Sequence, residues 1–413
     1  MIKYKDKYNR PVVVVTSMGL ITSIGDSVEE NWKCLISGKS GIKQISRFET
    51  ANLATKIAGC IENNLACEKG SNALTEYLAY NAITEALNNE RSFAGPLFIA
   101  LPPMELSWRS RFAICQHPTY SKMLDACKEE DYKILYDNIQ NSTIPYKLKK
   151  IFGFSGCPVA LTTACASGAT AINMAVNAIR YNKCNKALAV AADGSITPEL
   201  ITRFSLLGAL SKQNEEPTKA SKPFMENRSG FVMAEGAAAL VLETLDSALK
   251  NNKNILATIS GCGESTDTFH RTRSSPDNKA AIKAIRIALK DADLEPKDIN
   301  HINAHATSTI ENDKAEYQTL QKIFGEYLEH ISVTANKSML GHCLSAAGAI
   351  EAVIAILSLH HSLIPPTINY DKLDSTICLN IVANKSRSQN IQHVLSNSFG
   401  FGGQNSCLIF SKF

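Results

Sequence analysis

Two alternating patterns of apolar and polar residues run along this chain. Short apolar or β-branched runs predict buried strands, and apolar residues spaced three to four apart predict helices. In the first half the predicted strands are 11–16, 96–101, 159–163, 186–192 and 237–242, and the predicted helices are 27–35, 75–88, 167–181 and 245–250. Because strands that are apolar throughout are covered on both faces, we expect a parallel sheet between helices.

The second half repeats this order. Its predicted strands are 255–260, 299–304, 332–334, 394–399 and 406–410, and its predicted helices are 277–293, 313–324 and 346–359. A repeated order predicts a duplicated α/β architecture, with one half over residues 1–250 and the other over 251–413. Residues 102–150 mix proline, aromatic and charged side chains without a catalytic motif, so we expect a surface cap or a partner contact there.

Composition narrows the class of protein. The chain has 413 residues, 45% of them hydrophobic and 20% charged, which suits large globular cores. Its net charge of +4 is too small to indicate nucleic acid as the main partner. The twelve cysteines form no CxxC pair, so neither a zinc site nor a redox dithiol is indicated. The N-terminus lacks a signal-peptide core and no uninterrupted apolar stretch approaches ~18 residues, so we expect a cytoplasmic protein without a membrane span.

Cys165 lies where the predicted strand 159–163 turns into a helix rich in small residues. Unpaired backbone N–H groups and the positive end of the helix dipole favour a thiolate at such a position. This is a setting for a sulfur nucleophile. A buried free cysteine acting as a small hydrophobic residue explains the stretch equally simply, and the stretch alone leaves both interpretations open.

Three polar loops in the second half also follow predicted buried strands. The loop 303–309 contains His305, the loop 336–348 contains Lys337 and His342, and the loop 397–405 is rich in glycine and phenylalanine. A single histidine is more often structural than catalytic. However, the carboxyl ends of parallel strands line one crevice, so we expect these loops to lie near Cys165.

The cysteine corner, His-x-Thr-Ser-Thr, Lys-Ser-x-x-Gly-His and Ser-Phe-Gly-Phe-Gly-Gly together resemble the β-ketoacyl-acyl-carrier-protein synthases, type II most closely. The segment 222–238 resembles another block of that family. The resemblance runs from about residue 12 to 410 and is weakest between 95 and 150. It implies a thiolase-like fold, with two similar α/β halves in a five-layer αβαβα arrangement, and a homodimer. It also implies a decarboxylating condensation that lengthens an acyl chain by two carbons from malonyl-acyl-carrier protein.

The family pattern assigns roles to residues of this chain. Cys165 would carry the acyl group, and His305 and His342 would stabilise the charge that develops when carbon dioxide leaves. Lys337 would set the electrostatics around His305, or instead form a salt bridge to Glu316 or Asp313.

Further implied roles have structural alternatives. Phe399, Gly400 and Phe401 would supply an oxyanion hole and a gate, with simple packing as the alternative. Thr307 and Thr309 would bind the pantetheine arm, or else only stabilise local turns.

Further expectations concern bound ions, cofactors and partner proteins. No metal, redox cofactor or nucleotide is expected at the catalytic site. A structural monovalent cation is conceivable near Asn303, Glu351 and Asn397, although amide hydrogen bonding explains them as well. We interpret Glu226, Arg228 and Glu235 as a structural charge cluster. The expected partner is an acidic acyl carrier protein, and its candidate contacts are Lys212, Lys219, Arg271 and Arg273.

The sequence departs from the family pattern at three places, of which residues 102–108 concern the region that shapes the acyl tunnel and the dimer contact in that family. Ala306 replaces the usual glycine, Gln404 replaces a usual threonine, and residues 102–108 replace a glycine-rich segment. The departures at residues 102–108 and Gln404 keep open a synthase of a dedicated very-long-chain acyl or polyketide pathway. A non-catalytic chain-length partner subunit would lack the nucleophile that is present here. A thiolase would carry a second cysteine where His342 stands, and a type III synthase would have a Cys-His-Asn set.

Overall fold

The computed structural model describes residues 4–62, 71–106, 108–116, 119–126, 128 and 130–413. Eleven of the described strands form one continuous hydrogen-bonded sheet in the order β12-β10-β9-β14-β15-β8-β1-β7-β6-β4-β5. The first-half strands are β1 (Val13–Thr22), β4 (Leu97–Ala100), β5 (Val159–Leu161), β6 (Lys186–Asp193) and β7 (Gly236–Thr244). The second-half strands are β8 (Ala257–Thr266), β9 (His301–Asn303), β10 (Ser332–Thr334), β14 (His393–Phe399) and β15 (Gln404–Ser411), with β12 (Asn380–Ile381) at the edge. Two small sheets pair β2 (Lys43–Gln44) with β3 (Ile57–Ala58) and β11 (Leu363–Ile364) with β13 (Arg387–Ser388).

The two halves have the same topology. When the five main strands of each half are numbered along the chain, both halves have the order 3-2-4-5-1. In both, the strands numbered 3, 2 and 4 pair in parallel, and the pairs 4-5 and 5-1 are antiparallel. The halves join where β1 pairs antiparallel with β8, Val14 opposite Thr258. The expected duplication of an α/β unit is confirmed, whereas the division at residue 250 remains a prediction.

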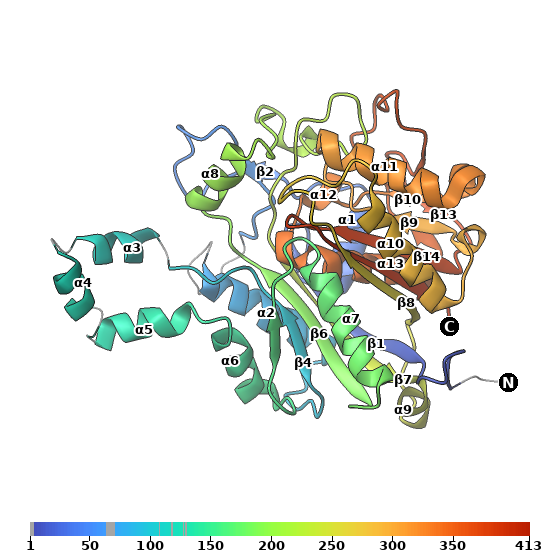
Figure 1. Ribbon diagram of the computed structural model, residues 1–413, viewed down its shortest axis with the longest axis horizontal. Coiled ribbons are helices and arrows are strands. Elements are labelled where there is room, and N and C mark those ends of the chain that lie inside the picture. The colour runs from blue at the N-terminus through green and yellow to red at the C-terminus, as the bar shows by residue number, and fades with distance from the viewer. Residues whose placement is uncertain (1–3, 63–70, 107, 117–118, 127, 129) are drawn as a thin grey trace.

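Helices cover both halves and fill the space between them (Figure 1). On the outside of the first half lies α2 (Asn72–Ala86), and α10 (Lys279–Ala292) and α11 (Ile310–Phe324) cover the outside of the second. Between the halves, α7 (Ser167–Arg180) packs against α13 (Ala347–His361). The shorter helices are α1 (Val28–Ile36), α8 (Pro198–Leu206), α9 (Leu245–Lys250) and α12 (Lys337–Leu340). The layers therefore follow the order αβαβα, as expected for a thiolase-like fold.

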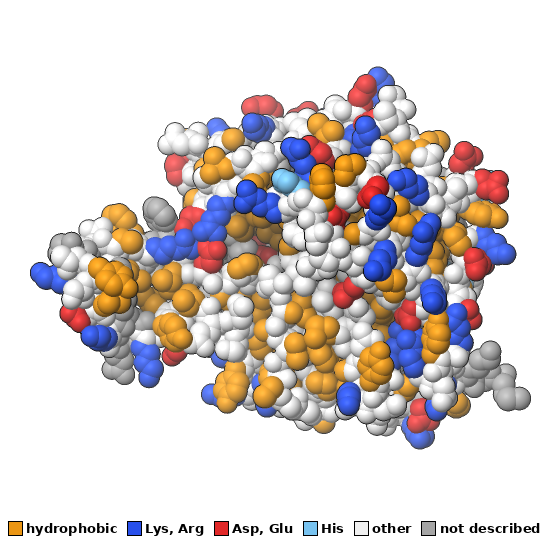
Figure 2. Space-filling model, in the orientation of Figure 1, with side chains coloured by type: hydrophobic (Ala, Val, Ile, Leu, Met, Phe, Trp, Pro, Cys, Tyr) orange, Lys and Arg blue, Asp and Glu red, His pale blue; other side chains and the backbone are white. Residues whose placement is uncertain are grey.

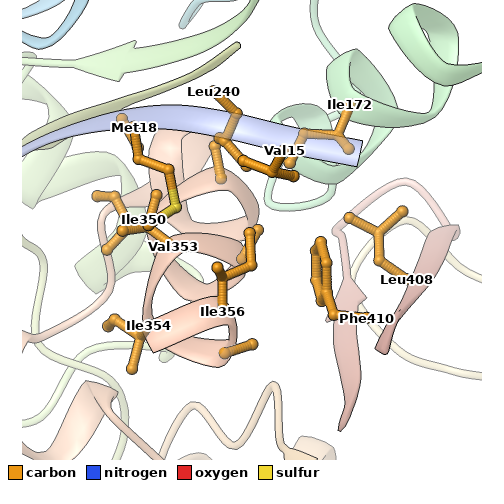
Figure 3. Close-up of a cluster of buried hydrophobic side chains, with 14 of the residues drawn as sticks. Val15, Met18, Ile172, Leu240, Ile350, Val353, Ile354, Ile356, Leu408 and Phe410 are labelled. Carbon is orange, nitrogen blue, oxygen red and sulfur yellow. The ribbon is translucent and has the colours of Figure 1, made fainter. Parts of the chain in front are cut away.

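The central helix α13 is apolar on every side, which is typical of a helix buried all round. Ile350, Val353 and Ile356 pack with Leu240 of the first half and Phe410 of the second (Figure 3). By length and hydropathy the segment Leu344–His361 could also cross a membrane. In the sequence Glu351 interrupts this apolar segment, so no membrane span was predicted there. In this fold 89% of the segment is buried inside the protein, so it is the core helix between the two halves.

The described residues between 102 and 150 form a helical arm. The helices α3 (Trp108–Cys115), α4 (Tyr120–Ala126) and α5 (Glu130–Asn138) project from the body, and α6 (Thr143–Phe152) returns the chain to it (Figure 1). Phe112, Tyr120 and Tyr136 are exposed on this arm. The segment is therefore at the surface, as the sequence indicated, but its helices were not predicted.

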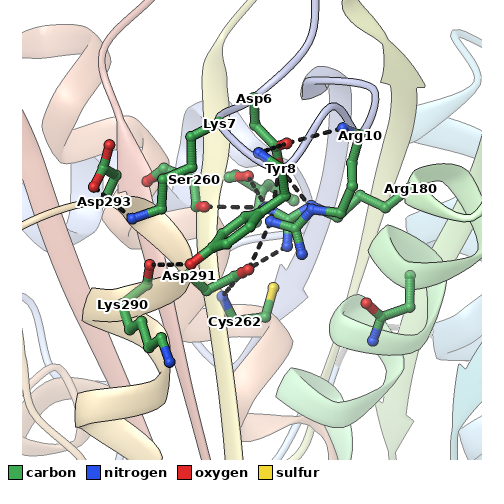
Figure 4. A network of polar contacts seen from close by, with 12 residues as sticks. Asp6, Lys7, Tyr8, Arg10, Arg180, Ser260, Cys262, Lys290, Asp291 and Asp293 are labelled. Carbon is green, nitrogen blue, oxygen red and sulfur yellow. Dashed lines mark hydrogen bonds and ion pairs between the residues drawn. The ribbon is translucent and has the colours of Figure 1, made fainter.

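The N-terminal segment links both halves through one carboxylate (Figure 4). Asp291, at the end of α10, accepts hydrogen bonds from Arg10 at 2.7 Å, from Arg180 at 2.6 Å and from the backbone N–H of Cys262 at 2.9 Å. The Arg180 side chain is only 4% exposed and also donates to two carbonyls of β8. The two guanidinium groups keep the pKa of Asp291 below its usual value, although burial opposes them. This cluster therefore fastens α7, β8 and α10 to the N-terminal segment.

We expect Asp291→Asn to reduce the free energy of unfolding by about 3 kcal/mol, because it leaves a buried arginine without its counter-charge. The matched control is Asp293→Asn, which removes the exposed pair of Asp293 with Lys7 and should cost less than about 1 kcal/mol. Urea unfolding followed by circular dichroism measures both. Equal losses would mean that the buried network contributes no more than a surface pair.

Candidate active site

Cys165 sits in a tight corner between β5 and α7. The hydroxyl of Ser167 accepts a hydrogen bond from the backbone N–H of Thr163 and donates to the carbonyl of Ala164, which closes the corner. Ala164 has a φ of 48°, in the left-handed region that costs a non-glycine residue about 1–2 kcal/mol. Gly168 has no room for a side chain, because a Cβ there would lie 2.5 Å from the backbone nitrogen of Ala349. The corner is thus packed directly onto the start of α13.

The two histidines approach from the second half. His305 follows β9 and His342 follows α12, and their rings lie 5.4 Å apart, nearly perpendicular. Both side chains are buried, and neither ring nitrogen of His342 has a hydrogen-bond partner among the described residues. Cys165, His305 and His342 line the same pocket of about 430 Å³, which we call the entrance pocket. The structure therefore brings the three side chains together.

Lys337 lies behind His305. Its ammonium group pairs with the buried carboxylate of Glu351 and lies 3.4 Å from Nδ1 of His305. The alternative of a salt bridge to Glu316 or Asp313 is wrong. Glu316 instead accepts the backbone N–H groups of His305 and Ala306. Since an ammonium group can only donate, Nδ1 accepts and Nε2 keeps the ring proton.

Both catalytic-candidate histidines are neutral. Burial lowers the pKa of His305 and of His342 well below the usual value, and the charge of Lys337 lowers both further. A neutral imidazole in this position can donate a hydrogen bond without carrying a charge. The two rings can thus act as donors to an oxygen that becomes negative in the pocket.

The sulfur of Cys165 does not match the expectation of a stabilised thiolate. Burial raises the pKa of its thiol to about 11, and the nearby carboxylate of Asp193 adds to this effect. The N–H of Phe401 and the charge of Lys337 lower it only in part. Desolvation is the largest of these effects, so the raised pKa opposes the expected thiolate. The sulfur of Cys165 is therefore held as a thiol in this structure, and it must lose its proton before it can act as a nucleophile.

We expect alkylation of Cys165 by iodoacetamide to rise about tenfold per pH unit up to a pH near 11. The sign follows from the raised pKa, because only the thiolate reacts and its fraction grows until the pH reaches the pKa. Peptide mapping by mass spectrometry reports this cysteine separately, with N-acetylcysteine as the control. A plateau below pH 8 would show that the helix terminus dominates after all.

The loop after β14 closes over the sulfur. Gly400 lies against the cysteine corner, where a Cβ would stand 3.0 Å from the carbonyl oxygen of Thr163. The N–H of Phe401 donates to the sulfur of Cys165, and the ring of Phe401 packs against Phe204 at 6.4 Å. Phe401 and Cys165 line both the entrance pocket and a second cavity of about 910 Å³, which we call the acyl cavity. This ring therefore stands between two spaces that meet at the sulfur.

Thr307 and Thr309 also line the entrance pocket. Their hydroxyl oxygens are 2.9 Å apart, and the hydroxyl of Thr309 caps α11 by accepting the N–H of Asn312. The local-turn role of Thr309 is thus present, and both hydroxyls still lie on the pocket wall.

Several residues around the site have strained backbone conformations with positive φ. Ala306, at the position where the family pattern has glycine, has a φ of 33°, and Ser308 and Leu344 also have positive φ. Residue 306 is therefore an alanine in a backbone conformation that glycine would adopt without strain.

We expect Ala306→Gly to stabilise the protein by about 0.5–1 kcal/mol, since the relief of strain exceeds the entropy cost of glycine. The control Ala304→Gly, two residues earlier and without positive φ, should destabilise it. Denaturant midpoints measure both variants. If Ala306→Gly is as destabilising as the control, the strain at this residue is negligible.

Several other candidates are separated by the fold. Arg228 pairs with Asp374, Glu226 with Lys372 and Glu235 with Arg47, so all three charges form ion pairs, as expected of structural residues. They do not form one cluster, because the partners of Arg228 and Glu226 lie two residues apart whereas Glu235 pairs with a distant segment.

The possible cation site has a clearer arrangement. Asn303 is hydrogen-bonded to Asn336 and to the carbonyl of Glu351, whereas single buried oxygens of Asn336, Glu351 and Asn397 have no partner in the described part of the chain. Oxygen atoms of this kind suit a monovalent cation, which stays a prediction. Within the described residues no group of three or more His, Cys, Asp or Glu could hold a metal ion.

One buried group of the site was missed. Asp193 ends β6, is 1% exposed and lines the acyl cavity with Cys165. It accepts hydrogen bonds from the N–H of Ser345 and from the hydroxyl of Ser195, and burial raises its pKa to about 6. Its position directly after a predicted strand was the available signal.

Comparison with known proteins identifies the class. The model of the β-ketoacyl synthase N-terminal domain matches residues 10–78 and 112–248, and that of the C-terminal domain matches residues 256–371. The chain therefore belongs to the β-ketoacyl synthase family, and it is an acyltransferase of the condensing class. Residues 79–111, which include the departure at 102–108, lie outside both matches.

Individual relatives agree with this assignment. The 3-oxoacyl-[acyl-carrier-protein] synthase 2 of Coxiella burnetii is 33% identical over 97% of this chain and 98% of its own length. That of Vibrio harveyi is 31% identical over the same shares. Among solved structures, a type II polyketide ketosynthase in complex with its acyl-carrier protein and bound to a hexaketide has a TM-score of 0.85 at 29% identity, covering 98% of this chain and all of that one. A β-ketoacyl synthase from Burkholderia phymatum has a TM-score of 0.82 at 28% identity, over 97% of this chain and 99% of that one.

Proposed function

We propose that this protein lengthens an acyl chain by two carbons, using malonyl-acyl-carrier protein as the donor. The observation that carries the proposal is the meeting of two cavities at the sulfur of Cys165. The entrance pocket also contains both neutral histidines, and the acyl cavity lies beyond Phe401. A condensation needs one space for the acyl group and another for the incoming malonyl thioester.

In the first step the sulfur of Cys165 attacks the carbonyl of an acyl thioester. A bond forms from this sulfur to the carbonyl carbon, the bond to the carrier sulfur breaks, and the thiol proton passes to the carrier thiolate. The N–H groups of Cys165 and Phe401, which both interact with this sulfur, are our candidate donors to the oxyanion. Because the thiol pKa is raised, loss of the proton is part of the barrier, and a neutral histidine can accept it.

In the second step malonyl thioester occupies the entrance pocket. Carbon dioxide leaves, and His305 and His342 donate hydrogen bonds to the enolate oxygen. The enolate carbon attacks the acyl-cysteine, the carbon–sulfur bond breaks, and the departing Cys165 thiolate takes up a proton from water to restore the resting thiol. Lys337 holds Nδ1 of His305 as an acceptor, so that Nε2–H can point to the substrate. Thr307 and Thr309 contact the pantetheine arm, and Phe401 opens the way to the acyl cavity.

The test is incubation with acyl-acyl-carrier protein followed by intact mass spectrometry and peptide mapping. We expect one acyl group per chain, on Cys165, and a β-ketoacyl carrier two carbons longer after malonyl carrier is added. Acylation on another residue, or none at all, would contradict the proposal.

A polyketide synthase is the second candidate. Its support is the wall of the acyl cavity, which includes the charged side chains of Arg47, Asp193, Glu199 and Arg203. Figure 2 shows Lys and Arg side chains along the edge of a hollow between the arm and the body. A panel of saturated and β-keto acyl carriers of equal length separates the candidates: a fatty-acid enzyme acylates Cys165 faster from the saturated ones.

The remaining expectations extend this proposal. We infer a cytoplasmic enzyme that uses an acyl carrier protein, needs no redox cofactor and does not act on nucleic acid. A homodimer is supported by β5, whose outer edge pairs with no other described strand and is open to a second copy. A non-catalytic role as a chain-length subunit is disfavoured by the presence of Cys165.

A further inference from the structure

Asp193 is a buried carboxylate without a counter-charge. It ends β6, is 1% exposed and lies on the wall of the acyl cavity together with Cys165. Within the described residues no Lys, Arg or His side chain forms an ion pair with it. Buried carboxylates in proteins are normally paired with a cation, so an unpaired one beside a nucleophile is a candidate for a role in the reaction.

Every cation that lines the acyl cavity is paired with another carboxylate. These ion pairs join Arg47 to Glu235, Lys147 to Glu76, Arg111 to Glu105 and Glu199, and Arg203 to Glu105. Lys337, whose charge also acts on Cys165, pairs with Glu351. Burial keeps the remaining titratable groups nearby, His305, His342 and Cys343, in their neutral forms. The negative charge of Asp193 is therefore not neutralised by any of these groups.

Asp193 also joins the half that holds Cys165 to the half that holds His342. One carboxylate oxygen accepts the backbone N–H of Ser345 at 3.1 Å, and the other accepts the N–H of Ser195 at 3.2 Å and its hydroxyl. Ser345 lies three residues after His342, in the turn Leu344–Ala346 that precedes α13. Neither ring nitrogen of His342 has a hydrogen-bond partner among the described residues, so the position of this ring depends on how the backbone around it is held.

We propose that Asp193 is a positioning residue, which fixes the turn after His342 relative to the cysteine corner and places a negative charge beside Cys165. The fixing of the turn rests on the proposed function, because a condensation needs the sulfur and the imidazole donors to meet at one substrate. The charge acts on the sulfur whatever the reaction is. It disfavours a second negative charge nearby, so it helps to keep Cys165 in the less reactive thiol form.

Alkylation of Cys165 by iodoacetamide, followed by peptide mapping, tests the charge without any acyl substrate. Asp193 is ionised above pH 7, because burial raises its pKa only to about 6. Removal of this charge in Asp193→Asn or Asp193→Ala makes the thiolate easier to form. The rise of the alkylation rate with pH should therefore shift to lower pH by at least about 0.5 unit in both variants. An unchanged pH dependence in both variants overturns the effect of the charge.

The ratio of β-ketoacyl carrier formed to carbon dioxide released tests the positioning, and it does not depend on the fraction of folded enzyme. In Asp193→Ala the turn with Ser345 is no longer tied to β6, so malonyl carrier still loses carbon dioxide but fewer enolates reach the acyl-cysteine. We expect the ratio to fall roughly fivefold, the effect of one lost buried hydrogen bond. Asp193→Asn retains an oxygen that can accept the N–H of Ser345, so its ratio should stay near that of the wild type. A wild-type ratio in Asp193→Ala overturns the positioning role.

The matched control is Glu85→Ala. Glu85 is a half-buried carboxylate that accepts the backbone N–H groups of Leu20 and Val28, and it lines neither cavity. This variant should lose stability and keep both the pH dependence of alkylation and the product ratio. Equal changes in Glu85→Ala and in the Asp193 variants would assign them to general destabilisation and overturn the proposal. If the wild-type protein releases no carbon dioxide from malonyl carrier, the proposed function itself fails, and the alkylation measurement still decides the effect of the charge.

Discussion

We expect replacement of Cys165 by alanine to abolish acyl-enzyme formation and to lower the condensation rate by at least about 10³-fold, because it removes the sulfur that we propose carries the acyl chain. Loss of carbon dioxide from malonyl carrier should persist in Cys165→Ala, since that step needs the imidazole donors and not the sulfur. Intact mass spectrometry measures the acylation, and release of labelled carbon dioxide measures the decarboxylation.

The matched control is Cys343→Ala. Cys343 is a second buried thiol, 2% exposed, which donates to the carbonyl of Glu235 and lines neither cavity. This variant should lose some stability and keep acylation of Cys165. Acylation that survives in Cys165→Ala would assign the nucleophile to another residue.

Replacement of either active-site histidine should remove the decarboxylation that Cys165→Ala retains. Each of His305→Ala and His342→Ala deletes one donor to the enolate oxygen, and such a donor contributes about 3 kcal/mol, or 10²–10³-fold in rate. Since both rings are neutral and buried in one pocket, the two losses should be similar. Release of carbon dioxide from malonyl carrier under single-turnover conditions measures this step.

His301→Ala provides the buried-histidine control. His301 is 1% exposed, lies on the same strand as Asn303 and contacts the carbonyl of Ser332 instead of the pocket. It should destabilise the fold without changing decarboxylation per folded molecule. Wild-type turnover in either His305→Ala or His342→Ala would exclude the mechanism with two histidines.

The pattern of residues predicted much of this architecture because strand and helix periodicity is local. The run 346–359 is apolar at nearly every position, and the structure places it as the central helix between the two halves. Strand ends could be located as well, so the loops with His305 and His342 were expected near Cys165. The helices of the arm were not predicted, because their mixture of proline, aromatic and charged residues has no clear period.

Ion-pair partners that are far apart in the sequence could not be predicted from local sequence patterns. Lys337 pairs with Glu351, and Arg228 with Asp374, although other acidic residues lie closer to each of them in the sequence. The choice depends on which buried segments the sheets bring together. The same holds for Ala306, whose positive φ is imposed by the loop that Glu316 holds through two backbone N–H groups.

By itself the sequence determined the duplicated α/β order, the corner that holds Cys165 and the identity of the polar loops, since these follow from the spacing of apolar residues and from short motifs. Only the tertiary structure decided the protonation of the site. Burial keeps the sulfur of Cys165 as a thiol and both imidazoles neutral, and burial is a property of all the surrounding segments at once. A periodicity of two or 3.6 residues contains no information about how much water reaches a side chain from distant parts of the chain.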